Sequence, residues 1–142
     1  MAAERTASTR WTGGLADGKG TVALESSNSA TLEVSWPART EAPDGLTSPE
    51  ELLAAAHSSC YSMQLSHMIA EAGGTPNRID TTAVVTFVVG KGITSSALTV
   101  RASVDGLDEA GFQQVAQGAK EQCPVSGLFH GNTEITLDAA LA

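Results

Sequence analysis

Basic residues are scarce in this 142-residue chain. Lys and Arg number eight against sixteen Asp and Glu, which gives a formal net charge of −8 at pH 7. Proteins that bind nucleic acid or anionic membranes need basic patches, because much of their affinity comes from the release of counterions at phosphate groups. This sequence has no such patch. We therefore expect that the protein binds neither nucleic acid nor a membrane surface.

Long apolar runs are also missing. No stretch approaches the ~20 apolar residues of a membrane-spanning helix, and the N-terminal segment MAAERTASTRWTGG lacks the apolar region of a secretory signal. We therefore expect a cytoplasmic protein. Aromatic residues make up only 4% of the chain, so aliphatic side chains and alanine must fill the interior. The length fits a single domain with its own core over residues 1–142.

Cysteine occurs only twice, at Cys60 and Cys123. Their wide separation excludes a CxxC motif, and a pair is too few for a four-cysteine zinc site. In a cytosolic protein, two cysteines are more typical of thiol redox chemistry than of a permanent disulfide. Composition alone leaves a second interpretation equally open, in which the two are unrelated thiols buried in the core.

Hydrophobic periodicity predicts an α+β fold with helices packed on antiparallel sheets. The stretches KGTVALES and ATLEVSW alternate as half-buried strands do, whereas the segment from Pro37 to Pro49 carries three prolines and one glycine. The predicted elements are N-terminal strands within residues 8–36, a loop over 37–48, a helix over 49–72, strands over 81–104, a helix over 109–122 and a last strand over 133–139.

The predicted helix over residues 49–72 has several independent start signals. Ser48 is a candidate N-cap, Pro49 takes the first helical position, and Glu51 completes a capping box. Its apolar side chains cover most sides of the cylinder, which indicates burial on more than one side. In so short a chain, this pattern predicts a homodimer in which a second copy covers part of the helix.

Cys60 lies in the middle of this helix, and its reactivity would require a nearby cation. A free thiol is mostly protonated at neutral pH, and the helix dipole has faded about eleven residues from the N-terminus. Arg39 is the candidate cation, and Glu50 could hold its guanidinium in a bidentate pair. Ten residues of helix span roughly 15 Å, so Glu50 cannot reach the thiol of its own chain unless the helix kinks. The alternative, favoured by the apolar helix, is that Arg39 and Glu50 act on Cys60 of a partner subunit.

Four stretches of the sequence closely resemble the osmotically inducible protein C (OsmC) family. They are WTG…GKGTV, TSPEELLAAAHSSCYSMQLS, CPVS at Cys123–Ser126, and EITLDAAL, and the resemblance runs from Trp11 to Leu141. A sister branch, the organic hydroperoxide resistance proteins, carries an arginine in a TGGRDG-like segment. This chain has TGGLADG, with Leu15 at that place, which favours the OsmC branch.

The resemblance implies an intertwined α+β homodimer with thiol peroxidase activity. It matches Cys60 to the peroxidatic cysteine, Cys123 to the resolving cysteine, and Glu50 and Arg39 to the activating carboxylate and arginine. The implied substrates are organic hydroperoxides and hydrogen peroxide, in defence against oxidative or osmotic stress. An external dithiol would reduce the resulting Cys60–Cys123 disulfide.

Neither a metal nor a cofactor is expected. His57 and His67 share a helix face with Cys60, but two histidines and a thiol on one continuous helix do not readily converge on a single ion. We expect instead that His57 is hydrogen-bonded in the core or near a dimer interface. The alternative function is a non-catalytic dimeric stress protein whose cysteines bind a metal or a small thiol.

Overall fold

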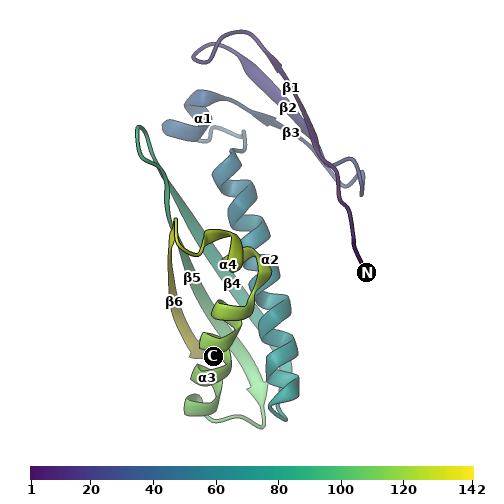
Figure 1. The fold of residues 1–142 in the computed structure, drawn as a ribbon, viewed down its shortest axis with the longest axis vertical. Coiled ribbons are helices and arrows are strands. Elements are labelled where there is room, and N and C mark those ends of the chain that lie inside the picture. The colour runs from purple at the N-terminus through teal and green to yellow at the C-terminus, as the bar shows by residue number, and fades with distance from the viewer. The chain divides into compact units, whose positions relative to one another are not determined.

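The computed structural model describes residues 1–142, which form two compact units, Met1–Leu52 and Leu53–Ala142. Six strands and four helices make up the chain (Figure 1). Helix α2 (Pro49–Glu71) begins in the first unit and continues through the second. The α+β class with two sheets is confirmed, whereas the single domain expected over residues 1–142 stays a prediction. No helix combines the length and the apolar character needed to cross a membrane.

The first unit is built on a three-stranded antiparallel sheet. Its strands, in the order β1-β2-β3, are β1 (Ser8–Thr12), β2 (Lys19–Ala23) and β3 (Thr31–Val34). A short helix, α1 (Trp36–Thr40), follows β3, where strand was expected up to residue 36 and a loop over 37–48. It forms because Ser35 caps it, accepting a 3.1 Å hydrogen bond from the Ala38 N–H, and because proline suits the first turn of a helix.

The second unit contains one sheet and three helices. After α2 come β4 (Thr75–Val88), β5 (Gly92–Asp105), α3 (Glu109–Gln122), α4 (Pro124–Phe129) and β6 (Glu134–Leu141). The N-cap expected at Ser48 is present, and Asp108 caps α3 in the same way. Ser48 Oγ accepts from the Glu51 N–H at 3.1 Å at the start of α2, and Asp108 Oδ1 accepts from the Gly111 N–H at 2.8 Å at the start of α3. Both caps use donors that the helix itself leaves free.

One strand pair departs from the predicted antiparallel arrangement. The sheet order is β4-β5-β6, and β4 and β5 form the expected antiparallel hairpin. Strand β6 pairs with β5 in parallel, from Ser95 opposite Glu134 to Ala102 opposite Leu141. The reason is the connection, because α3 and α4 carry the chain back along the sheet before β6 begins, as a crossover between parallel strands requires.

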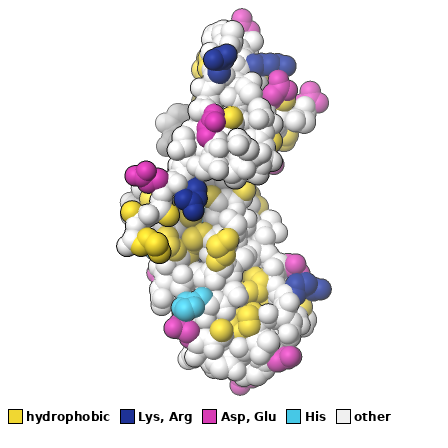
Figure 2. Space-filling view, turned by 90° about the vertical axis from the view of Figure 1, so that its right-hand side faces the viewer, with side chains coloured by type: hydrophobic (Ala, Val, Ile, Leu, Met, Phe, Trp, Pro, Cys, Tyr) yellow, Lys and Arg dark blue, Asp and Glu magenta, His cyan; other side chains and the backbone are white.

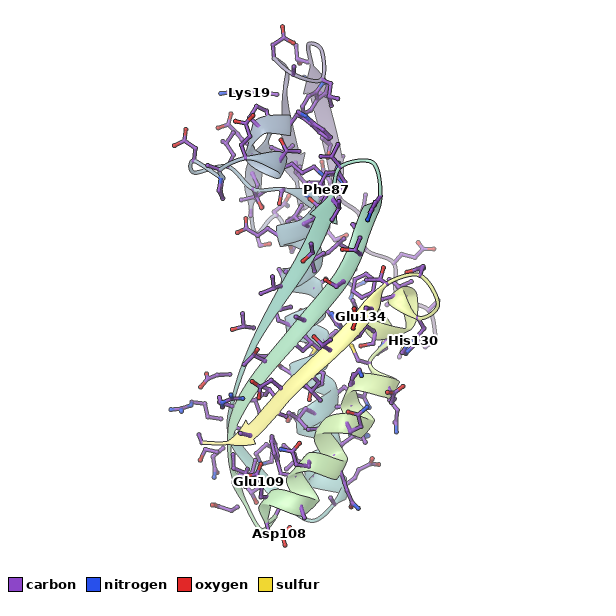
Figure 3. All side chains as sticks on the ribbon, turned by 90° about the vertical axis from the view of Figure 1, so that its left-hand side faces the viewer. Lys19, Phe87, Asp108, Glu109, His130 and Glu134 are labelled. Carbon is purple, nitrogen blue, oxygen red and sulfur yellow. The ribbon has the colours of Figure 1, made fainter.

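The core of the second unit lies between the sheet and helices α2 and α3. In Figure 3 the sheet faces the viewer and both helices lie behind it, with Asp108 at the start of α3. The fully buried hydrophobic side chains of α2, β5 and α3 are Tyr61, Leu65, Ile69, Leu98, Val100, Ala102, Phe112, Ala116 and Ala119. The Tyr61 hydroxyl donates a 3.0 Å hydrogen bond to the Ala116 carbonyl, which satisfies the one polar atom of this side chain. This packing fixes α2, which carries Cys60, against α3, which ends directly before Cys123.

Candidate active site

The two cysteines of the chain meet in the second unit. Cys60 lies on α2 and Cys123 lies directly after α3, and their Sγ atoms are 3.0 Å apart. Both are free thiols. Cys123 is only 1% exposed, whereas Cys60 is partly exposed. One thiol is therefore accessible to a small molecule, and the other is buried within reach of it.

Local sequence explains why Cys123 lies at this point. Its backbone N–H donates to the Ala119 carbonyl at 2.9 Å and closes the last turn of α3. Pro124 cannot continue that helix, but it suits the first position of a new one, and α4 starts there. Cys123 is thus held at the junction of two helices, where its backbone is extended (φ −59°, ψ 123°).

The surroundings of Cys60 favour the neutral thiol. Burial raises the pKa of Cys60, and the adjacent Cys123 thiol raises it further because two sulfurs this close compete for negative charge. A hydrogen bond from the Val125 backbone N–H acts in the opposite direction but does not outweigh them. A cation beyond these groups is therefore needed to make Cys60 a thiolate at neutral pH.

His57 lies one helical turn before Cys60 and is fully buried. Its Nδ1 atom is 2.6 Å from Ser96 Oγ on β5, and its Nε2 atom is 2.8 Å from Ser126 Oγ on α4. Burial lowers the pKa of His57, so the ring is neutral at pH 7. The expectation of a hydrogen-bonded core histidine is confirmed. Sequence reasoning missed its partners Ser96 and Ser126, although Ser126 belongs to the CPVS motif.

Arg39 and Glu50 form a bidentate ion pair within the first unit. Arg39 Nε lies 3.0 and 3.1 Å from the two Glu50 carboxylate oxygens, and Nη2 lies 2.7 Å from Oε1. The Glu50 side chain is 9% exposed and that of Arg39 is 27% exposed. The guanidinium also lies 5.8 Å from the centroid of the Trp36 ring. A carboxylate and an aromatic ring together restrict this cation to one orientation.

An apolar cleft of about 380 Å³ opens beside Arg39 in the first unit. Its ten lining residues, which are mostly apolar, are Thr9, Trp11, Leu15, Val22, Val34, Ser35, Trp36, Arg39, Pro49 and Leu52.

Both pairs of site residues that the sequence predicted are formed. Arg39 meets Glu50 in the first unit, and Cys60 meets Cys123 in the second. No group of three or more His, Cys, Asp or Glu side chains is arranged to hold a metal ion.

A family model described as OsmC-like protein matches residues 42–138. The chain belongs to the OsmC family. The resemblance inferred from its motifs is thereby confirmed. A curated OsmC relative, the peroxiredoxin OsmC of Escherichia coli (strain K12), is 44% identical over 134 residues, which cover 92% of each chain.

Solved structures with the OsmC fold include organic hydroperoxide resistance proteins. The protein from Elizabethkingia anophelis is 26% identical with a TM-score of 0.74, and the match covers 100% of both chains. The protein OhrB of Bacillus subtilis is 25% identical with a TM-score of 0.70, covering 94% of this chain and 97% of that one. Relatives named as a peroxiredoxin and as hydroperoxide resistance proteins thus share both sequence and fold with this chain.

Proposed function

We propose that this protein is a cysteine-based thiol peroxidase that reduces organic hydroperoxides, and hydrogen peroxide as well. The observation that carries the proposal is the pair of free thiols 3.0 Å apart, one partly exposed and one buried. A partly exposed thiol can meet a peroxide, and a buried neighbour can trap the oxidised product. Support also comes from 44% identity to a protein named peroxiredoxin OsmC.

The proposed reaction has three steps. The Cys60 thiolate attacks one peroxide oxygen, so that an S–O bond forms, the O–O bond breaks, and the alcohol leaves after taking up a proton. The Cys123 sulfur then attacks the Cys60 sulfenic acid, an S–S bond forms, and the oxygen leaves as water. An external dithiol reduces this disulfide by two exchange reactions and is itself oxidised to a disulfide.

The first step needs a thiolate, and we assign its stabilisation to Arg39. Burial and the neighbouring thiol both raise the pKa of Cys60, so its own surroundings do not supply this charge. Glu50 fixes the Arg39 guanidinium through three short contacts. Because α2 is a single helix from Pro49 to Glu71, ten residues of helix, roughly 15 Å, separate Glu50 from the Cys60 of its own chain. The Arg39–Glu50 pair therefore serves Cys60 of a partner subunit.

A homodimer is supported by the apolar surface of the second unit. Met63 on α2 is 72% exposed, and Val84 on β4 is 58% exposed. Figure 2, which views the side where α2 lies, has several groups of hydrophobic side chains at the surface of this unit. Strand β4 is also a 14-residue edge strand, and long edges with apolar side chains are normally covered. A second copy of the chain would cover these surfaces.

Peroxide turnover tests the function. The purified protein is given an alkyl hydroperoxide or hydrogen peroxide together with dihydrolipoamide or another dithiol, and peroxide loss is followed. We expect turnover by the native protein, none by Cys60→Ser, and a single oxidation event by Cys123→Ser. Ser59→Ala is the matched control, because Ser59 is exposed beside Cys60 and its hydroxyl bonds only the Ala56 carbonyl. If the native protein binds metal or a small thiol tightly but consumes no peroxide, the non-catalytic alternative replaces this proposal.

We place this activity in the cytoplasm and in defence against oxidative or osmotic stress. The chain is strongly acidic, with a pI of about 4.7, and it has too few basic residues for a nucleic-acid-binding surface. Such a protein is repelled by phosphate-rich polymers and remains free to meet small neutral peroxides. Its reductant is a dithiol small or flexible enough to reach the partly exposed Cys60 sulfur.

A further inference from the structure

We propose that His57 is a positioning residue for the second chemical step, the formation of the Cys60–Cys123 disulfide. The inference rests on the proposed function and adds a residue that the peroxide chemistry itself does not use. His57 is 0% exposed, as are Ser96 and Ser126, and each ring nitrogen contacts one of the two serine hydroxyls. The two ring nitrogens are hydrogen-bonded to side chains of two different elements, β5 and α4, so the buried ring connects these elements.

The hydrogen bonds of His57 to Ser96 and Ser126 lie close to the thiol pair in the fold, and one of them joins the same two segments. His57 and Cys60 are one turn apart on α2, and Cys123 and Ser126 are three residues apart at the start of α4. Two contacts therefore join the same two segments, His57 Nε2 to Ser126 Oγ at 2.8 Å and Cys60 Sγ to Cys123 Sγ at 3.0 Å. The first contact sets where α4 lies against α2, and this in turn sets where the Cys123 sulfur lies.

The sheet provides the fixed end of this network. Ser96 lies on the central strand β5, opposite Val85 of β4 and Ile135 of β6. It holds Nδ1 of the ring at 2.6 Å, so the imidazole cannot rotate without losing this contact. Phe129, the last residue of α4, also packs edge-on against the ring, with centroids 5.1 Å apart and an interplanar angle of 78°. His57 thus contacts α4 at two places, at Ser126 in its middle and at its last residue, Phe129.

Disulfide formation is the step that depends on this placement. The sulfenic acid of Cys60 and the thiol of Cys123 become a disulfide and a water molecule, and the sulfurs must close from 3.0 Å to about 2.05 Å. A displacement of about 1 Å in reacting groups can cost a hundredfold in rate. The first step, attack of Cys60 on peroxide, forms no bond to Cys123, and Cys123 and the Val125 N–H act on it only through the pKa of Cys60. Loss of His57 should therefore slow the second step selectively.

A neutral imidazole suits this role because it donates through one nitrogen and accepts through the other. Each serine hydroxyl can take the complementary part, and no buried side-chain nitrogen or oxygen lacks a partner. Glutamine at position 57 can replace one of the two hydrogen bonds, and alanine can replace neither. The order native, His57→Gln, His57→Ala is therefore expected for the rate of disulfide formation.

Rapid mixing with one equivalent of an alkyl hydroperoxide separates the two steps. A sulfenic-acid probe and mass spectrometry follow first the oxidation of Cys60 and then the disulfide. For Ser126→Ala and His57→Gln we expect the second rate to fall about tenfold or more, and the first, which depends on α4 only through the pKa of Cys60, to change much less. Excess peroxide should then convert Cys60 to the sulfinic acid in these variants. Ser62→Ala is the matched control, because its hydroxyl lies on the same helix but bonds Ser58 and Thr81.

Three outcomes separate this proposal from the proposed function. If the folded Ser126→Ala and His57→Gln proteins form the disulfide at the native rate, His57 does not position Cys123. If these variants slow both steps equally, or if Ser62→Ala has the same effect, the role is general stability and the inference is wrong. If the native protein fails to oxidise Cys60 at all, the peroxidase function itself fails. Ser126→Ala keeps the histidine and removes one hydroxyl, so a folded variant is expected even where His57→Ala does not fold.

Discussion

Replacement of Arg39 by alanine should affect stability and the peroxide reaction in different ways. In the first unit the Glu50 side chain is 9% exposed, and its carboxylate is held by Arg39 through contacts of 2.7 to 3.1 Å. Arg39→Ala leaves this carboxylate buried without its counter-ion. Glu50→Gln leaves the guanidinium, which is 27% exposed and is solvated more easily. The arginine variant should therefore be the less stable of the two.

The magnitude follows from this burial. Removing one partner of a fully buried ion pair costs about 3–5 kcal/mol, whereas breaking an exposed pair costs about 0–1 kcal/mol. Because Arg39 is 27% exposed, water can partly solvate the carboxylate after the change, and we expect a loss of about 1–3 kcal/mol. For a chain of this size, such a loss lowers the melting temperature by roughly 3–10 °C.

The matched control is the exposed pair Arg101–Asp138. Its closest contact is 3.2 Å, and the two side chains are 44% and 68% exposed. Arg101→Ala should cost less than about 1 kcal/mol and leave peroxide reduction unchanged. Urea denaturation followed by circular dichroism measures stability for both arginine variants and for Arg39→Lys, which keeps the charge but loses the bidentate geometry.

The rate of Cys60 oxidation distinguishes a catalytic arginine from a structural one. Loss of a fixed cationic donor to the reacting atoms should lower the second-order rate constant about a hundredfold in Arg39→Ala, with Arg39→Lys intermediate. The rate is measured below the unfolding range of each variant, so that stability does not limit it. A rate equal to that of the native protein in a destabilised Arg39→Ala would show that the ion pair only holds the first unit together, and the assignment of Arg39 to the thiolate would be refuted.

Two further predictions concern pH and backbone packing. Burial lowers the pKa of His57 below its ordinary 6.5, so below about pH 6.5 the unfolded chain takes up a proton before the folded chain, and the free energy of unfolding falls. Urea midpoints at about pH 7.5 and 5.5 measure this loss, and His57→Gln should show a smaller one. Gly18→Ala would place a Cβ against the Gly14 carbonyl and 2.7 Å from the Thr12 carbonyl in the turn before β2, and it should lower the unfolding midpoint. Gly127→Ala in α4 meets nothing within 4 Å and should be neutral or stabilising, and equal effects of the two glycine changes would contradict this packing.

Features set by neighbouring residues could be predicted from the sequence. The caps at Ser48 and Asp108 depend on donors three residues away, and both are present. The short helix α1 obeys the same rules, with Ser35 as its cap, but the prolines within and after it led to the prediction of a loop. Strand β4 includes Pro76 and extends beyond the predicted strand because it lies at a sheet edge, where a missing backbone N–H costs little.

Features that depend on contacts distant in sequence could not be predicted in this way. Periodicity placed Cys60 within the helix predicted over 49–72 and Cys123 directly after the helix predicted over 109–122, but it could not supply the 3.0 Å between their sulfurs. The partners of His57 come from β5 and α4, and no spacing rule connects residues that far apart. The parallel pairing of β6 likewise depends on how α3 and α4 return the chain along the sheet. The family motifs predicted a role for each site residue, and the structure adds the contacts that each one makes.

The proposed mechanism requires that Cys60 and Cys123 form one redox centre. Intact-protein mass spectrometry after reaction of the reduced chain with one equivalent of an organic hydroperoxide tests this. The native protein should lose the mass of two hydrogen atoms as one intramolecular disulfide forms, and Cys123→Ser should gain oxygen on Cys60. Thiols that react no faster than free cysteine, or oxidation elsewhere in the chain with Cys60 and Cys123 still reduced, would contradict it.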